Sequence, residues 1–183
     1  MSLKLLEKIE NILELFQYAR LKYREKKAFH VSQLARVIAS PKSHKRKNGA
    51  EIGRKAHEVL WSLDPYTILQ EDAVSFPFPL ASEIKVSKEK YIIYGVPDLI
   101  LFESGVPKEI YEFKSYSTLD RYSVIQTQIY AYLCSKCFET HVKAFLILGW
   151  NGRSCKKKIK VEWNKREVEE NVKKAIMKIV SGD

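Results

Sequence analysis

The sequence predicts a mixed α/β fold, and three observations favour it. Apolar residues recur at helical spacing near both ends of the chain, whereas short runs rich in Ile, Val, Tyr and Phe fill the middle. The 183 residues are 45% hydrophobic and 11% aromatic, which excludes a disordered chain. A chain of this length can bury one sizeable core. We therefore expect a single domain spanning 1–183, with a central mixed sheet flanked by helices.

The N-terminal part, residues 1–63, is expected to be a helical extension. Leu, Ile and Phe recur every three or four positions in 3–27, which predicts one long amphipathic helix. Ser32 is placed to cap a short second helix. A basic loop is expected at 40–49, and a further amphipathic helix at 50–63.

The sheet core is expected at 64–163. Alternating or apolar β-type runs predict strands at 67–78, 83–87, 90–96, 99–102, 110–116, 142–150 and 156–163. A hairpin turn is expected at 105–108, and a helix at 118–137 is inserted between strands. Asn164 is expected to cap the C-terminal helix within 164–183.

The charge of the chain favours an acidic partner. With 32 Lys and Arg against 22 Asp and Glu, the formal net charge is +10, and nucleic acid is the commonest partner of such proteins. The basic loop contributes Lys42, Lys45, Arg46 and Lys47, which we expect to contact DNA phosphates. A solvated lysine-rich face is the alternative reading of the same composition.

Nothing in the sequence indicates a membrane or an export signal. The longest strongly apolar stretch, 144–150, is far shorter than the ~20 residues that span a bilayer. The N-terminus lacks an apolar signal region, and an odd number of cysteines does not make a disulfide framework. We therefore expect a cytoplasmic protein with no membrane partner.

One constellation carries chemistry. Asp98 stands between two apolar strands, and Glu112 and Lys114 lie two positions apart on a later strand. Period-two geometry places the latter two on one face of the sheet, and a hairpin can fold Asp98 back beside them. Two carboxylates suit a hard divalent cation, and a lysine can orient water or offset charge that develops on a phosphate.

The acid–x–lysine pattern by itself is not specific. It also occurs at Glu25–x–Lys27 and at Glu83–x–Lys85, where Asp72 precedes the pair at a plausible distance. The rival set lacks the Pro–Asp turn between two apolar strands. Surface salt bridges along a strand are the alternative for every such triplet.

Two further pairs extend the constellation. Gln126 and Tyr130 lie four positions apart on the helix 118–137, so they share one face of it and flank its apolar stripe. Gln128 and Tyr132 form a second, overlapping pair on the opposite flank, and we prefer the first pair on spacing. Upstream, His57 lies four positions after Gly53 on a predicted helix; a helical histidine of this kind is more often structural than a ligand.

Taken in order, these residues resemble the PD-(D/E)XK nucleases of the RecB type, above all the CRISPR-associated exonucleases of the fourth Cas family. The resemblance runs from about residue 31 to residue 132. It implies a restriction-endonuclease-like core and a metal held by His57, Asp98, Glu112 and the carbonyl of Phe113. It also implies catalysis by Asp98, Glu112 and Lys114, with Gln126 and Tyr130 positioning the lysine and the DNA strand. 

The cysteines depart from this family. The Cas exonucleases hold an iron–sulfur cluster on four cysteines, and the three cysteines here, Cys134, Cys137 and Cys155, are not placed as theirs are. We expect no cluster. The three cysteines and His141 together would supply the four ligands of a zinc site. Cysteines on a packed helix, however, usually behave as small hydrophobes, so zinc is not expected either.

The sequence thus predicts a Mg²⁺- or Mn²⁺-dependent DNA nuclease, more in keeping with an exonuclease, that is faster with Mn²⁺ if His57 is a ligand. Arg121, just past the site, could grip an unpaired DNA end. Two alternatives stay open: a non-catalytic DNA-binding or assembly subunit, and a structure-specific endonuclease such as a junction resolvase. The long N-terminal helix could also dock a protein partner or a second copy of the chain.

Overall fold

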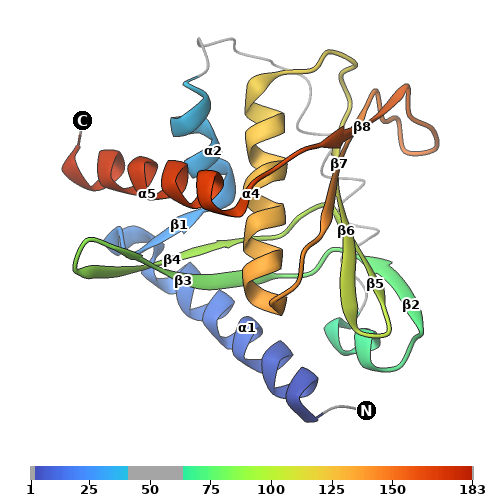
Figure 1. Cartoon of the computed structure of the whole chain (residues 1–183), viewed down its shortest axis with the longest axis horizontal. Coiled ribbons are helices and arrows are strands. Elements are labelled where there is room, and N and C mark those ends of the chain that lie inside the picture. Colours follow the sequence, from blue (N-terminus) through green and yellow to red (C-terminus); the bar gives the residue numbers. More distant parts are fainter. Residues whose placement is uncertain (1–2, 41–63, 183) are drawn as a thin grey trace.

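The computed structural model describes residues 3–40 and 64–182, and within these ranges it is a mixed α/β structure of two sheets covered by helices (Figure 1). The expected single central sheet is therefore divided in two. The basic loop, with its Lys and Arg residues at 42–47, and the predicted helix carrying His57 lie outside the described residues.

The smaller sheet has three strands in the order β1-β4-β3. These strands are Ala28–His30 (β1), Leu80–Val86 (β3) and Glu89–Gly95 (β4). β1 pairs with β4 in parallel, and β3 and β4 form a long antiparallel hairpin.

The larger sheet has five strands in the order β2-β5-β6-β7-β8. Its strands are Ala73–Phe76 (β2), Leu99–Glu103 (β5), Val106–Lys114 (β6), Lys143–Leu148 (β7) and Lys157–Val161 (β8). All pairs are antiparallel except β6 and β7, which are parallel. A parallel pair needs a crossover connection, and here a helix supplies it.

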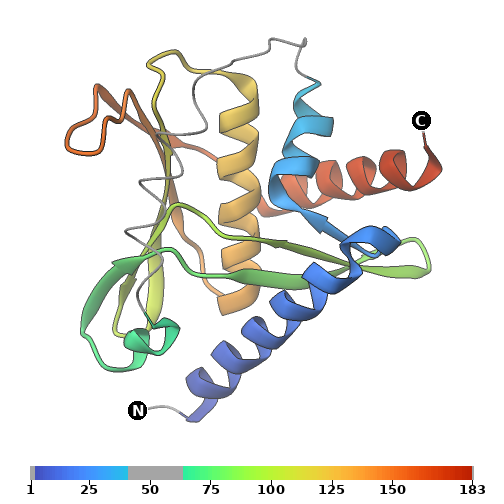
Figure 2. The same ribbon diagram turned by 180° about the vertical axis from the view of Figure 1, so that it is seen from behind.

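The helices comprise Leu3–Lys22 (α1), Val31–Ala39 (α2), Arg121–Phe138 (α4) and Lys165–Ser181 (α5), with short 3-10 helices at Tyr23–Glu25 (η1) and Pro65–Leu69 (η2). α4 lies between the five-stranded sheet on one side and α2 and α5 on the other, as both views show (Figures 1 and 2). α1 packs on β3 and β4 of the smaller sheet. No helix in the described ranges is long and apolar enough to cross a membrane.

A cluster of phenylalanines fills the centre where the two sheets and α4 meet. Phe76, Phe78, Phe102 and Phe138 are buried, and their ring centroids lie 5.6–6.1 Å apart, mostly edge to face. Such aromatic pairs add stability beyond the area they bury. The cluster packs β5 and α4 together, and part of the site described below lies on α4 and directly before β5.

The N-terminal part was expected to be helical throughout, but its described residues also include a strand. α1 ends at Lys22, and η1 follows it, closed by Lys26 in the left-handed region with φ 55°. Ala28, Phe29 and His30 form β1, because their backbone pairs with β4. α2 is capped by His30 rather than by Ser32, since His30 Nδ1 accepts a hydrogen bond from the Ser32 N–H at 3.2 Å. A three-residue strand carries too little periodicity to be recognised in a sequence.

Other boundaries shift for local reasons. The strand expected at 67–78 is a strand only from Ala73 onward, since η2 occupies its first residues. α4 begins at Arg121 because the Asp120 carboxylate accepts a hydrogen bond from the Ser123 N–H at 2.9 Å. Asn164 caps α5 as predicted, accepting from two backbone N–H groups.

The β5–β6 hairpin turns at Ser104 and Gly105, one residue earlier than expected. Both residues have left-handed φ values, 49° and 77°, which suit the tight turns that join twisted strands. The register that follows pairs Leu99 with Tyr111. It therefore brings the residue before β5 and the residue after Tyr111 to the same place, which is where the candidate site lies.

Candidate active site

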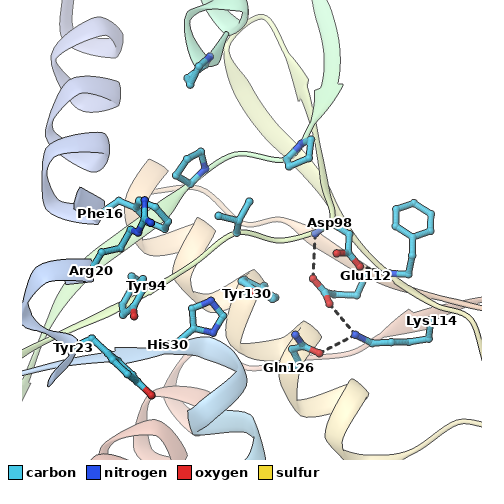
Figure 3. A pocket seen from close by; sticks show the side chains of 15 residues that line it. Phe16, Arg20, Tyr23, His30, Tyr94, Asp98, Glu112, Lys114, Gln126 and Tyr130 are labelled. Carbon is cyan, nitrogen blue, oxygen red and sulfur yellow. Dashed lines mark hydrogen bonds and ion pairs between the residues drawn. The ribbon is translucent and has the colours of Figure 1, made fainter. Parts of the chain in front are cut away.

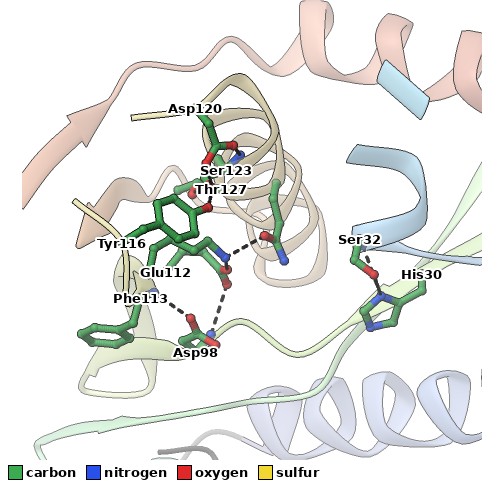
Figure 4. Close-up of polar contacts among 11 residues, drawn as sticks. His30, Ser32, Asp98, Glu112, Phe113, Tyr116, Asp120, Ser123 and Thr127 are labelled. Carbon is green, nitrogen blue, oxygen red and sulfur yellow. Dashed lines mark hydrogen bonds and ion pairs between the residues drawn. The ribbon is translucent and has the colours of Figure 1, made fainter. Parts of the chain in front are cut away.

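Asp98 and Glu112 lie together at the end of the β5–β6 hairpin. The Asp98 backbone N–H donates to Glu112 Oε1 at 3.2 Å, and the Phe113 N–H donates to Asp98 Oδ2 at 2.7 Å (Figure 4). Asp98 is 8% exposed and Glu112 only 1%. Backbone donors thus hold two buried carboxylates in fixed positions beside each other, as the sequence predicted.

Lys114 lies on the same face of β6 as Glu112, because side chains two apart on a strand point the same way. Its ammonium donates to Glu112 Oε2 at 3.1 Å and to Gln126 Oε1 at 2.9 Å (Figure 3). Gln126 comes from α4, which lies over this face of the sheet. Four of the predicted residues, Asp98, Glu112, Lys114 and Gln126, therefore form one connected polar network.

The electrostatics of this network depend on burial. Burial, together with the neighbouring Asp98 charge, raises the pKa of Glu112 to about 8, although Lys114 acts in the opposite direction. Burial lowers the pKa of Lys114, but the Glu112 and Asp98 carboxylates outweigh it, and the net shift is upward. These shifts favour the ammonium form of Lys114, and they make the carboxylate pair bind a proton more readily than isolated carboxylates do. A divalent cation would compete with that proton.

The network lines one side of a cleft of about 770 Å³. The lining residues come from both sheets and from α1 and α4: Phe16, Arg20, Tyr23, His30, Pro65, Pro77, Pro79, Tyr94, Val96, Asp98, Glu112, Phe113, Lys114, Gln126 and Tyr130 (Figure 3). This volume falls within the range of about 300–1,000 Å³ typical of pockets that enclose small ligands.

Tyr130 lies one helical turn beyond Gln126 and also lines the cleft. It is almost fully buried, and burial, followed by the charges of Glu112 and Asp98, raises the pKa of its phenol well above the ordinary value. Gly95 makes room for the ring: a Cβ at this position would lie 2.9 Å from Tyr130 Cε1. The sequence did not reveal this role of Gly95, because nothing in the pattern shows which side chain approaches a glycine.

The alternative pair, Gln128 and Tyr132, does not line the cleft. Gln128 Nε2 donates to the Glu162 carbonyl at 2.9 Å, beyond β8. Tyr132 is fully buried, and its pKa is raised by burial and by Glu169 of α5. The structure therefore brings Gln126, rather than Gln128, to Lys114.

Of the predicted DNA contacts, Arg121 lies within the described residues. Arg121 is exposed on the first turn of α4 and is not among the described residues that line the cleft. The aromatic residue next to the site, Tyr116, is engaged in a hydrogen bond with Ser123 (Figure 4). Lys42, Lys45, Arg46 and Lys47 lie outside the described residues.

The cysteines make contacts of their own. Cys134 is fully buried, Cys137 Sγ donates to the Ala81 carbonyl at 3.2 Å, and Cys155 is exposed on the β7–β8 connection. His141 stacks on Trp163, with ring centroids 4.9 Å apart. Burial raises the pKa of the Cys134 thiol, and it raises that of Cys137 to about 12, so both thiols are protonated at neutral pH.

The described donors suit a hard divalent cation. Asp98 and Glu112 offer carboxylate oxygens, and the Phe113 carbonyl lies on the strand between Glu112 and Lys114. Magnesium commonly binds one or two carboxylates and keeps several waters. Residues 3–40 and 64–182 hold no group of three or more His, Cys, Asp and Glu side chains that could bind a metal; the predicted fourth ligand, His57, lies outside these ranges.

Comparison by sequence gives no relative: no family model matches this chain, and no curated protein matches it. By structure, the chain is similar to the crystal structure of SSO0001. The match has a TM-score of 0.53 at 18% sequence identity, and it covers 89% of this chain and 84% of that one. At this identity the likeness establishes a shared mixed α/β fold and does not extend to activity.

Proposed function

We propose that this protein is a metal-dependent DNA nuclease with a PD-(D/E)XK-type core, which hydrolyses phosphodiester bonds. The observation that carries the proposal is the network of Asp98, Glu112, Lys114 and Gln126, buried along one side of a cleft. Burying two carboxylates beside each other costs free energy, and strongly perturbed pKa values cluster at functional sites. The net charge of +10 fits a polyanionic substrate.

Each residue then has a distinct part. Asp98 and Glu112 would hold a Mg²⁺ or Mn²⁺ ion, with the Phe113 carbonyl and His57 as the further expected ligands. When bound, such an ion supplies an activated water and offsets charge on the phosphate. Lys114, held as an ammonium by Glu112, would donate to a non-bridging phosphate oxygen and stabilise the charge that develops there. Gln126 would fix the direction of the ammonium.

The test is cleavage of end-labelled linear single-stranded, linear double-stranded and circular DNA in Mg²⁺, Mn²⁺ or EDTA. We expect linear substrates to disappear only with metal, faster in Mn²⁺, and not with Lys114→Ala. Nicked circles would assign the same chemistry to an endonuclease. DNA binding without cleavage in any metal would contradict the proposal and leave a non-catalytic binding subunit.

A further inference from the structure

The side of the cleft opposite the carboxylates has a different chemistry. Arg20 at the end of α1, Tyr23 of η1, His30 of β1 and Tyr94 of β4 line it together (Figure 3). We call these four residues the cationic–aromatic wall. Among the described residues that line the cleft, the carboxylates are Asp98 and Glu112, both on the other side. The wall therefore offers a cation, an imidazole and two phenol rings to whatever enters the cleft.

Ring packing holds the wall in place. His30 and Tyr94 are register partners in the parallel β1–β4 pair, and their rings meet edge to face with centroids 5.3 Å apart. Phe16 packs on Tyr94 in the same manner at 5.8 Å. Tyr94 is thus clamped from two sides and largely buried, and it forms a fixed floor rather than a mobile surface.

The polar atoms of the wall are directed by local hydrogen bonds. His30 Nδ1 accepts from the Ser32 N–H at 3.2 Å and lies 2.7 Å from the Ser32 hydroxyl (Figure 4). With Nδ1 an acceptor, the neutral ring carries its proton on Nε2, which makes Nε2 a donor. Burial lowers the pKa of His30 and so favours this neutral form. Burial raises the pKa of Tyr94; the nearby Tyr23 adds to this rise, and the nearby Arg20 opposes it.

The exposed members are the ones that could meet a ligand first. Tyr23 is 46% exposed, and Arg20 is exposed beside it. An accessible aromatic ring next to a guanidinium is the combination that stacks on a nucleobase and pairs with its phosphate. Lysine-rich surfaces, by contrast, bind phosphates without reading a base.

We propose that the cationic–aromatic wall is a nucleotide-binding subsite, in which Tyr23 stacks on a base while Arg20 and His30 donate to the adjoining phosphate. The assignment of a nucleotide as ligand rests on the proposed nuclease function, whose carboxylates lie across the same cleft. In that setting the wall would hold the nucleotide next to the bond that is cut, and it would also retain a released mononucleotide.

The experiment measures binding of 2′-deoxyadenosine 5′-monophosphate to the full chain in EDTA, by calorimetry, so that the metal centre takes no part. Deoxyribose 5-phosphate, which lacks the base, and inorganic phosphate are the matched probes. We expect the nucleotide to bind about tenfold or more tightly than the sugar phosphate, because stacking on one aromatic ring contributes this much. Equal affinities would overturn the base-stacking assignment.

Single variants separate the two interactions. Tyr23→Ala is expected to remove the preference for the nucleotide. Arg20→Ala is expected to weaken the binding of both 2′-deoxyadenosine 5′-monophosphate and deoxyribose 5-phosphate by about tenfold. Tyr18→Ala and Arg24→Ala, exposed neighbours that are not among the described residues lining the cleft, serve as controls. Wild-type binding by both Tyr23→Ala and Arg20→Ala would overturn the proposal.

The outcome is distinguishable from failure of the nuclease proposal. Lys114→Ala is expected to lose cleavage but to keep the preference for the nucleotide over deoxyribose 5-phosphate, because both probes carry the phosphate that Lys114 would meet. Tyr23→Ala is expected to lose that preference and to raise KM with kcat little changed. If the wild type cleaves no DNA but the Tyr23 and Arg20 effects on binding hold, the nucleotide subsite stands and the nuclease assignment falls. If the wild type cleaves DNA but the Tyr23 and Arg20 variants bind the mononucleotide normally, the nuclease assignment stands and the nucleotide subsite falls.

Discussion

Two strands of this protein carry the same glutamate–x–lysine pattern in opposite surroundings. On β6, Glu112 is buried under α4 and Lys114 bridges it to Gln126. On β3, the Glu83 side chain is 52% exposed and pairs with Lys90 at 2.8 Å, and Lys85 is exposed as well. One pattern is a component of a buried network, and the other is a surface ion pair.

The difference arises from what each strand face meets. Alternation places both members of either pair on one face. α4 packs over the β6 pair, and Asp98 lies opposite Glu112. On β3, α1 packs on the strand, yet the Glu83 and Lys85 side chains remain exposed. Asp72, the acid that would complete the second set, precedes β2 in the other sheet. A short charged motif thus acquires its chemistry from burial and from its partner strand.

The largest expected effect is on the buried pattern. Glu112→Gln and Lys114→Ala should each lower kcat for DNA cleavage by about 10²–10⁴-fold, since they remove a metal ligand and a fixed positive charge. Glu83→Gln and Lys85→Ala on the surface pattern should cleave as wild type. Single-turnover cleavage rates in Mg²⁺ measure this. Equal losses at the two patterns would show that burial does not distinguish the β6 pattern from the β3 pattern.

A smaller effect is expected one contact further out. Gln126→Ala should lower the cleavage rate by about 10–100-fold, because the ammonium of Lys114 loses the acceptor that directs it. Gln128→Ala, on the other flank of α4, is the matched control and should leave the rate unchanged. A greater loss for Gln128→Ala would mean that the wrong glutamine faces the reaction.

The burial of Glu112 predicts a pH dependence of stability. Its pKa is raised from 4.5 to about 8 in the folded protein, so the folded state binds a proton that the unfolded chain has lost. The contribution is full below about pH 4.5 and disappears as the pH rises through about 8. In EDTA, the free energy of unfolding of wild type relative to Glu112→Gln should therefore fall across this window. His30, whose lowered pKa gives the opposite trend, is present in both proteins, so its contribution cancels when the two are subtracted.

Metal binding should reverse this trend, because cation and proton compete for the carboxylates. The stabilisation that Mg²⁺ gives to wild type should grow as the pH rises towards 8. Urea titrations at several pH values, with and without Mg²⁺, measure both effects. If the stability of the wild type relative to Glu112→Gln does not change with pH, the pKa of Glu112 is not raised by folding.

The smallest expected effect concerns packing behind the site. Gly95→Ala should lower the free energy of unfolding by about 1–3 kcal/mol, because the new methyl group would press on the Tyr130 ring. Combining it with Tyr130→Leu should give less than the sum of the two single effects. Strict additivity in this double-mutant cycle would show that the two residues do not meet.

Much of this site could be predicted from the sequence, since it depends on local geometry. A hairpin between two apolar strands brings Asp98 to Glu112, and strand alternation adds Lys114. The sequence favoured Gln126 over Gln128 but could not decide between them, because both border the same apolar stripe. The packing of α4 decides which one reaches Lys114.

The cationic–aromatic wall lay beyond prediction for a different reason. Its residues come from α1, η1, β1 and β4, and no short spacing links them. The three-residue strand β1 that carries His30 is too brief to show a period, and the division into two sheets follows from pairing between distant segments. Contacts of this kind are set by tertiary packing, which leaves no periodic trace in the chain.

The central claim is that Asp98 and Glu112 hold a divalent cation, and Mn²⁺ titration followed by electron paramagnetic resonance tests it most directly. The account predicts that the wild type takes up Mn²⁺, that Asp98→Asn weakens the affinity by about tenfold or more, and that Asp72→Asn at the rival position leaves it unchanged. Wild-type affinity in Asp98→Asn, or an equal loss in both variants, would contradict it.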